Sequence, residues 1–456
     1  MRGAERIRSG AAVALLGVAL ACGGPPPTPT ARNLVIVSLD TLRADRLGVY
    51  GYERNTSPNL DAFASEAFVF ERAQSAGNAT VGAHHAIFQS RPASQAIAHK
   101  ETAPTLAGLL HSRGWRTAGF TDGGTMSRAM GFARGFQRFD DGNHGLAESL
   151  PKALAWIDEV QSGSPPFYLF LHSFDVHLPY DPPPPFDGQF GPAYRGQVEG
   201  KQTLRLLRGL RRILEPNLLS EPMVLSPADR ERVNALYDGE IAKTDALLGP
   251  LLARLDAADL RDDTLVVVLS DHGEEFWEHG SVLHSHTLYQ ELLHVPLLLR
   301  VPAWRERARR IAARVSMIDL VPTLFELLAA SPPPPPPGLQ GRSLVPLLEA
   351  SEREPEPAAI LSEGYPFGLN QQSLIAGRFK LIRTLPTGRV ELYDLEADPA
   401  EQNDLAAARP GLRKRMLAAL ERELPAGAAP VADPLARPEE LDPETRKRLQ
   451  ELGYID

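Results

Sequence analysis

Residues 33–40 read NLVIVSLD, and this stretch decides the fold class. It is a short apolar run rich in β-branched residues, and it ends in an acid, Asp40. Such a run is typical of a strand that is buried on both faces, as in a parallel sheet covered by helices. Asp40 would then lie at the carboxyl end of its strand, which is where open α/β sheets bind ligands.

Three further apolar runs repeat the pattern. Residues 165–180 (PPFYLFLHSFDVHLPY) and 264–276 (TLVVVLSDHGEEF) end in acids and histidines, whereas 294–302 (HVPLLLRVP) is plainly apolar. Segments with helical character lie between the runs, for example residues 57–73 and 230–255. Because strands that alternate with helices build a sheet covered on both faces, we predict an α/β protein with a three-layer α/β/α core.

Chain length and a change in the sequence pattern near the C-terminus suggest two domains. A chain of 456 residues has room for a large domain and a smaller one. We assign residues 33–350 to the large, catalytic domain. Residues 379–399 (FKLIRTLPTGRVELYDLEADP) have the pattern of a hairpin and are followed by helical segments, so 355–456 are predicted to form a small C-terminal α+β domain. The net charge of −9 argues against a nucleic-acid partner.

The N-terminus has the features of an export signal. Residues 1–21 combine a basic start with an apolar run that is too short to span a bilayer. Cys22, the only cysteine of the chain, follows in a sequence similar to a bacterial lipoprotein box, although Ala19 stands where leucine is usual. We expect a signal peptide, a lipid anchor on Cys22, a tether over 22–32, and an exported protein held at a membrane. The alternative is a periplasmic protein with a cleaved signal and an incidental cysteine.

Acids, histidines and a hydroxyl collect at the predicted strand ends. Asp40, Asp271 and His272 offer oxygen and imidazole ligands from separate strands, which suits a divalent cation. Each has a plainer explanation alone, because an aspartate can cap a helix and Asp-His-Gly can form a turn. The density of histidines from 272 to 286 favours a metal or anion site instead. The remaining candidates are Thr80, His84, His172, Asp175, His177, His279, His284 and His286.

From residue 33 onward, these motifs closely resemble the sulfatases, within the alkaline phosphatase superfamily. The resemblance implies an alkaline-phosphatase-like α/β/α domain with a small C-terminal sheet domain. It also implies a reaction in which a metal-bound nucleophile attacks the sulfur or phosphorus of an ester. The segments that carry it are 33–70, 166–180, 265–280, 286–302, 316–328, 389–406 and the ending RKRLQELGYID, 446–456.

The resemblance assigns the metal ligands residue by residue. Asp40, Asp271 and His272 match family metal positions. Sulfatases usually carry a second acid where Thr41 stands, and often carry asparagine where His272 stands. His272 and Thr80 favour zinc or manganese, whereas the family resemblance favours calcium.

The resemblance also suggests which side chains contact the ester. His177 matches the family histidine that contacts the anion. His284 or His286 lies where a lysine or histidine contacts the sulfate. Arg43 either supports the anion or is a helix surface residue.

The nucleophile position departs from the family pattern. Sulfatases carry Cys-x-Pro-Ser-Arg or a serine variant there, and the first residue is oxidised to formylglycine. Residues 80–84 (TVGAH) take this place, so that Thr80 replaces the cysteine and His84 the arginine. Threonine has a β-methyl group, and its oxidation would give a ketone rather than an aldehyde. We therefore predict that no formylglycine forms.

Three mechanisms remain open at this stage. Thr80 can be a metal-activated nucleophile, as in the threonine phosphodiesterases and phosphotransferases of the superfamily. Metal-bound water can attack, with His84 or His177 as general base. Alternatively, the site only binds a sulfated or phosphorylated ligand. A second metal would need an acid and two histidines, for which the candidates are Asp175, His177, His284 and His286.

The overall expectation is a metal-dependent hydrolase of sulfate or phosphate esters. Its cofactor is a divalent cation, calcium, zinc or manganese, and its substrate a small molecule or glycan that carries the ester. Its other partner is the membrane, through the lipid anchor.

Overall fold

The computed structural model describes most of the chain after the predicted tether. The signal peptide over 1–21 and the anchor at Cys22 lie outside the described residues and stay predictions. Within the described part, no helix combines the length and apolar character needed to cross a bilayer. The described residues are 31–161, 165–191, 194–210, 225–328, 338–349, 359–364, 370–424, 435 and 438–455.

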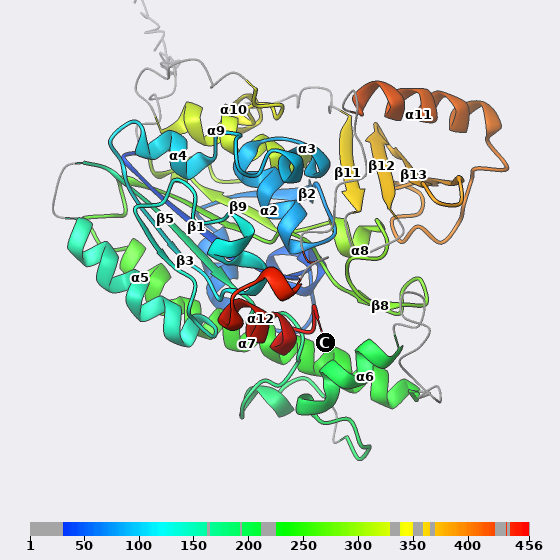
Figure 1. The fold of residues 1–456 in the computed structure, drawn as a ribbon, viewed down its shortest axis with the longest axis horizontal. Coiled ribbons are helices and arrows are strands. Elements are labelled where there is room, and N and C mark those ends of the chain that lie inside the picture. The colour runs from blue at the N-terminus through cyan, green and yellow to red at the C-terminus, as the bar shows by residue number, and fades with distance from the viewer. Residues whose placement is uncertain are drawn as a thin grey trace, which may run out of the picture.

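A large twisted sheet forms the centre of the molecule (Figure 1). Among the described residues it has eight strands in the order β10-β2-β9-β6-β1-β5-β3-β4, and only the pairings of β9 are antiparallel. The strands are β1 (Asn33–Leu39), β2 (Phe68–Gln74), β3 (Arg116–Phe120), β4 (Arg138–Asp140), β5 (Phe167–Ser173), β6 (Thr264–Leu269), β9 (Leu297–Arg300) and β10 (Arg310–Ser316).

The strand β1, which contains most of the NLVIVSLD stretch, lies at the middle of this sheet. Every residue of β1 is buried, and Ile36 pairs with Phe170 of β5 on one side and with Val267 of β6 on the other. Alternate side chains of β1 enter two different hydrophobic cores, with Val35 in one and Leu34 in the other. The predicted buried strand and its parallel environment are therefore confirmed.

Helices cover both faces, which confirms the three-layer architecture. The core that contains Val35 is closed by α1 (Pro58–Ala64), α5 (Leu146–Val160) and α7 (Pro227–Leu255). Figure 1 shows α5 and α7 below the sheet and α4, α9 and α10 above it. The helices of the second layer are α2 (Thr80–Gln89), α3 (Ala93–Ala98), α4 (Leu106–His111), α9 (Leu320–Leu327) and α10 (Val345–Glu349).

The helical prediction for residues 57–73 is wrong in its second half. The helix α1 ends at Ala64, and the chain continues into β2 at Phe68. Val69 points into one core, whereas Phe68 and Phe70 point into the other, as the period of two in a strand requires. Sheet pairing with β9 and β10 decides the conformation of this apolar run.

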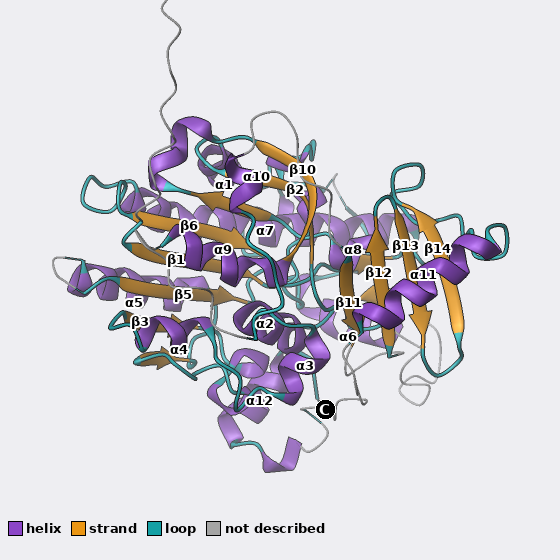
Figure 2. Ribbon diagram, turned by 90° about the horizontal axis from the view of Figure 1, so that it is seen from above, coloured by secondary structure: helices purple, strands orange, loops and turns teal. Residues whose placement is uncertain are grey.

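A second, antiparallel sheet follows the large domain along the chain. It has the order β11-β12-β13-β14, and the hairpin predicted over 379–399 is its β13–β14 pair. Figure 2 shows this sheet beside the large domain with α11 packed across it. The elements are β11 (Ile360–Gly364), β12 (Gln371–Ala376), β13 (Phe379–Thr384), β14 (Arg389–Asp394) and α11 (Pro410–Glu423).

The C-terminal segment leaves the small sheet and returns to the large domain. We expected all of 355–456 in one unit, but α12 (Pro443–Glu451) buries Leu449 and Leu452 in the core of the large sheet. In Figure 1 α12 lies beside the large domain, away from β11 to β14. A nine-residue helix with a short apolar stripe carries no sequence signal for the domain on which it will pack.

Shorter elements join the two sheets. Residues 275–283 form a small ribbon of β7 (Glu275–Phe276) and β8 (Val282–Leu283), and α8 (Gln290–Leu293) packs beneath the small sheet. The remaining helix, α6 (Thr203–Leu210), lies next to β8.

His279, in the β7–β8 ribbon, connects the two domains. Its Nδ1 lies 2.7 Å from Glu291 Oε1, its Nε2 lies 3.2 Å from the carbonyl oxygen of Glu401, and its ring stacks on Tyr289. Burial lowers the pKa of His279, but the hydrogen bond and charge of Glu291 outweigh it and raise the pKa to about 9.

This raised pKa predicts a pH-dependent stability. The unfolded value is near 6.5, so the stabilisation is complete below pH 6.5 and is lost as the pH rises through about 9. We expect the free energy of unfolding, measured by urea denaturation, to fall by about 1–3 kcal/mol over this range. His279→Gln should remove the decline, and the exposed control His111→Gln should keep it. An equal pH profile for wild type and His279→Gln would contradict this account.

Candidate metal centre

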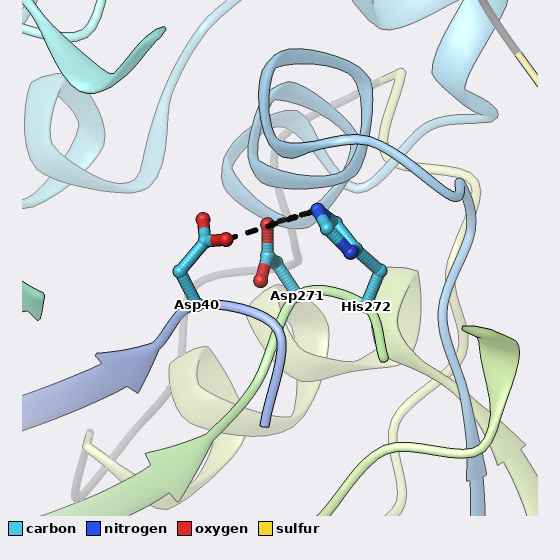
Figure 3. A group of neighbouring side chains, drawn as sticks. All are labelled: Asp40, Asp271 and His272. Atoms are coloured by element: carbon cyan, nitrogen blue, oxygen red, sulfur yellow. Dashed lines mark ion pairs between the residues drawn. The ribbon is translucent and has the colours of Figure 1, made fainter. Parts of the chain in front are cut away.

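The adjacent strands β1 and β6 bring the predicted metal ligands together. Asp40 follows β1, and Asp271 and His272 follow β6, which pairs with β1 in parallel register. One ligand atom of each residue lies within 4.8 Å of the others, and all three side chains are fully buried (Figure 3). His272 Nε2 lies 3.4 Å from Asp271 Oδ2 and 4.0 Å from Asp40 Oδ1.

The carboxylate oxygens of this group fit a cation. Within the described part of the chain, Asp40 Oδ1 and both side-chain oxygens of Asp271 are buried and make no hydrogen bond. Imidazole nitrogens lie 3.3–3.4 Å from Asp271 Oδ2, but not in hydrogen-bonding geometry. Buried carboxylates without partners are costly, and a coordinated cation is the usual compensation.

The electrostatics of the pair lead to the same conclusion. Burial, and after it the charge of Asp271, raises the pKa of Asp40 well above its usual range. Burial also acts to raise the pKa of Asp271, but the imidazoles of His272 and His84 outweigh it and hold that pKa below its usual range. The protein alone therefore disfavours the state in which Asp40 and Asp271 are ionised at the same time. A bound divalent cation would stabilise both carboxylates in that state.

Thr80 lies at the edge of this group, as predicted. It is the first residue of α2, a helix whose residues are all buried. Its hydroxyl oxygen lies 3.4 Å from His272 Nε2. The start of α2 thus places a buried hydroxyl next to a predicted metal ligand.

His84 lies behind the acids instead of facing the ester. Its Nδ1 is 3.1 Å from the carbonyl oxygen of Thr80 and 3.3 Å from Asp271 Oδ2, and its Nε2 is 2.9 Å from Ser38 Oγ. The edges of Phe88, Phe132 and Phe170 enclose the ring. This departs from the expected ester contact and suits a side chain that orients Asp271.

His177 and His284 are neighbours, with 5.0 Å between their ring centroids, and both contact the same hydroxyl. Their Nε2 atoms lie 3.2 and 3.5 Å from the hydroxyl oxygen of Tyr454. His177 Nδ1 lies 2.7 Å from the carbonyl oxygen of Leu178, which can only accept a hydrogen bond, so Nε2 is left as the acceptor of the neutral ring. Burial, and after it His284, lowers the pKa of His177 to about 3, so this ring is neutral at pH 7.

The structure distinguishes between His284 and His286, the two histidines of residues 283–289 (LHSHTLY). His286 Nε2 lies 2.6 Å from Glu275 Oε2 and its Nδ1 lies 3.1 Å from the carbonyl oxygen of His284, so its ring is engaged away from Thr80. His284 stands between Leu283 and Ser285, which both have positive φ angles, 70° and 68°. Left-handed backbone at non-glycine residues is strained and clusters at functional sites.

Glu274 is a site residue that the sequence analysis did not select. Its Oε1 lies 2.8 Å from His284 Nδ1, and its Oε2 accepts a hydrogen bond of 2.6 Å from the Tyr180 hydroxyl. This contact fixes the ring so that Nε2 of His284 lies 3.5 Å from the hydroxyl oxygen of Tyr454. The motif DHGEEF contains the residue, but spacing alone does not distinguish it from Glu275.

Arg43 does not reach the ester side of the site. Its guanidinium forms ion pairs of 2.7 Å with Asp45 and 2.6 Å with Glu278, and it donates a further hydrogen bond to the carbonyl oxygen of Glu274. These partners occupy the donors that an anion would need. The predicted anion contact thus finds no support in its surroundings.

The suggested second metal set is not assembled either. Asp175 forms a 3.0 Å ion pair with Lys243 and accepts a hydrogen bond from the backbone of Leu146, while His286 is paired with Glu275. Among the described residues, one group alone has the spacing of a metal site.

Two further residues complete the surroundings. His172, at the end of β5, has Nε2 3.4 Å from Asp40 Oδ2. Tyr454, from the C-terminal segment, has its hydroxyl oxygen 3.0 Å from Thr80 Oγ1. Burial, and after it the charge of Asp40, raises the pKa of Tyr454 well above its usual range, so the phenol stays protonated. The sequence carried no signal for Tyr454, because this contact spans most of the chain.

Two family models match this chain. The family model described as Sulfatase matches residues 32–330. A second model, described as N-sulphoglucosamine sulphohydrolase, C-terminal, matches residues 278–426. The two matches together extend from the first strand of the large sheet through the small sheet and α11.

Curated relatives match over part of their length. Arylsulfatase K of Gallus gallus is 33% identical over 189 residues, which are 39% of this chain and 34% of the relative. Arylsulfatase K of Rattus norvegicus is 28% identical over 297 residues, 58% of this chain and 49% of the relative. The matched region thus spans a third to a half of these relatives.

Solved structures share the fold. The phosphonate monoester hydrolase of Agrobacterium radiobacter superposes with a TM-score of 0.67 at 20% identity, covering 86% of this chain and 96% of that one. A structure in complex with its substrate D-glucosamine-2-N,6-O-disulfate superposes with a TM-score of 0.65 at 20% identity, covering 86% and 97%.

The buried Asp271 oxygens that make no hydrogen bond allow metal binding to be tested by mutation. Asp271→Asn keeps the shape of the side chain but removes its charge. We expect the affinity for the divalent ion to fall by about 100-fold or more, because losing even a supporting residue costs 10–100-fold. Elemental analysis after dialysis should find stoichiometric metal in the wild type and in Asp262→Asn, an exposed control, but not in Asp271→Asn. Equal metal content in all three would contradict the assignment.

Proposed function

The chain belongs to the sulfatase family, and we propose that it is a metal-dependent hydrolase of sulfate or phosphate esters that works without formylglycine. The observation that carries the proposal is the position of the Thr80 hydroxyl, 3.4 Å from His272 Nε2 and beside two buried carboxylates. Here the family places its nucleophile, and this chain offers a threonine.

Asp40, Asp271 and His272 would hold the cation, which when bound lowers the pKa of a neighbouring hydroxyl and polarises the ester. Thr80 Oγ1 is placed to attack sulfur or phosphorus. His177, whose Nε2 is the acceptor of the neutral ring, takes the proton that Thr80 releases. The leaving ester oxygen departs with its electron pair and is protonated from solvent, and water then cleaves the Thr80 ester.

His284 has the complementary role. Glu274, 2.8 Å from Nδ1, would stabilise an imidazolium whose Nε2–H points toward the Tyr454 hydroxyl, 3.5 Å away. A charged donor at this position binds an ester anion through a charge-assisted hydrogen bond. His177 thus accepts the proton of Thr80, whereas His284 donates a hydrogen bond to the ester anion.

The missing formylglycine favours phosphorus over sulfur when Thr80 is the nucleophile. A formylglycine hydrate has a second hydroxyl that can expel sulfate, whereas a threonine sulfate must wait for water to attack its sulfur. Thr80 therefore supports a phosphate ester hydrolase, including the phosphodiesterase alternative. Sulfate ester hydrolysis would instead use metal-bound water. If neither reaction occurs, the site is one that binds an anionic ligand.

We place the enzyme outside the cytoplasm, on the predicted signal over 1–21 and anchor at Cys22. A phosphorylated or sulfated sugar is the favoured substrate class, because one structural neighbour takes a glucosamine disulfate and the second family model is that of a sulphohydrolase. Calcium, zinc and manganese all remain compatible with the two carboxylates and one imidazole.

Turnover assays test the nucleophile. The full chain, supplied with each of the three metals, is assayed on an aryl sulfate, an aryl phosphate and a bis-aryl phosphate. Thr80→Ala should lower kcat for the phosphate ester by about a thousandfold or more, since it removes the attacking atom. Thr80→Ser, which keeps a hydroxyl, should retain measurable turnover, and the exposed control Thr387→Ala should match the wild type.

The remaining outcomes discriminate between the alternatives. Sulfate turnover that survives Thr80→Ala would point to metal-bound water. The absence of turnover on all three esters, together with the absence of stoichiometric metal, would sink the hydrolase proposal in favour of a binding protein.

A further inference from the structure

The C-terminal segment is fastened to the large domain by several contacts. Leu449 and Leu452 are buried in its core, at 0% and 5% exposure. Arg448 Nε donates a hydrogen bond of 3.0 Å to the carbonyl oxygen of Asp122. These contacts hold α12 against the large domain at the rim of the metal centre.

A tight reversal after α12 then directs Tyr454 inward. Gly453 has a φ angle of +81°, and a Cβ atom at this position would lie 2.7 Å from a methyl carbon of Leu204. The backbone N–H of Tyr454 donates to the carbonyl oxygen of Leu449 at 2.8 Å. Both the conformation and the close approach require glycine, so the sequence Leu-Gly-Tyr builds the turn that delivers the phenol.

The Tyr454 hydroxyl lies where three reacting groups meet. It is 3.0 Å from Thr80 Oγ1, 3.2 Å from His177 Nε2 and 3.5 Å from His284 Nε2. Its ring lies nearly parallel to that of His177, with 5.5 Å between centroids and 28° between planes. An ester anion attacked by Thr80 and bound by His284 must therefore lie against this hydroxyl.

We propose that Tyr454 is a substrate-contacting residue whose hydroxyl donates a hydrogen bond to an oxygen of the ester anion. The inference rests on the proposed function and adds one donor to that site. Two residues expected to contact the anion are engaged elsewhere. His84 stands in place of the family arginine and lies behind Asp271, and Arg43 is bound to Asp45 and Glu278.

The anchoring of the tail argues for a fixed wall of the site over a removable plug. Withdrawal of Tyr454 would pull on a segment that buries Leu449 and Leu452 and that holds a backbone carbonyl of Asp122. Rotation of the hydroxyl hydrogen from His177 or Thr80 toward an incoming oxygen requires no movement of the chain. The C-terminal segment therefore stays in place, and only the hydroxyl hydrogen of Tyr454 turns toward the oxygen of the ester anion.

Anion binding tests this role without relying on turnover. Tyr454→Phe removes the hydroxyl and keeps the ring stacked on His177. Calorimetric titration of the metal-loaded full chain with inorganic phosphate, and separately with sulfate, should show about 10- to 100-fold weaker binding of at least one anion. The melting temperature should stay at its wild-type value. Ile455→Ala, the matched control, changes the packing of the same tail without touching the donor, and should bind the anions as the wild type does.

Each remaining outcome has a definite meaning. Unchanged or tighter anion binding by Tyr454→Phe, or faster ester turnover, would overturn the proposal and identify the tail as a plug. A wild type that binds neither anion would overturn it as well. Anion binding that depends on Tyr454 in a protein that hydrolyses none of the esters would support the inference while the hydrolase proposal fails. In an active enzyme, the KM for the ester should rise with the loss of anion affinity.

Discussion

The parallel pairing of β1 with β6 is the constraint on which the site depends. Their register sets Ser38 opposite Leu269, so the residues that follow, Asp40 and Asp271, leave the sheet at the same edge. Both side chains are fully buried, which two carboxylates do not tolerate without a compensating charge. The sheet therefore creates an electrostatic demand that one divalent cation can meet.

The surrounding side chains keep this arrangement in place. His84 and His172 lie within 3.3–3.4 Å of Asp271 and Asp40 from behind, and Glu274 fixes the ring of His284. Each belongs to a different segment of the chain, so the geometry depends on the packing of the whole large domain. The result is a polar site in which Thr80 Oγ1 lies 3.4 Å from His272 Nε2 and 3.0 Å from the Tyr454 hydroxyl oxygen.

The sequence predicted the parts of this site that follow directly from local pattern. Apolar runs that end in acids located β1, β5 and β6, and the spacing after them located Asp40, Asp271 and His272. Residues 57–73 were predicted as helix because short apolar runs do not reveal sheet pairing. Tyr454 was missed for a different reason. Its contact with Thr80 joins positions 374 residues apart, and only the packing of α12 on the large domain creates it.

Anomalous X-ray diffraction from crystals grown with zinc or manganese would locate the ion. We expect one strong peak within coordination distance of Asp40, Asp271 and His272, with the Thr80 hydroxyl as a further ligand. A peak bound by other residues, or no peak at this position in crystals that contain the metal, would contradict it.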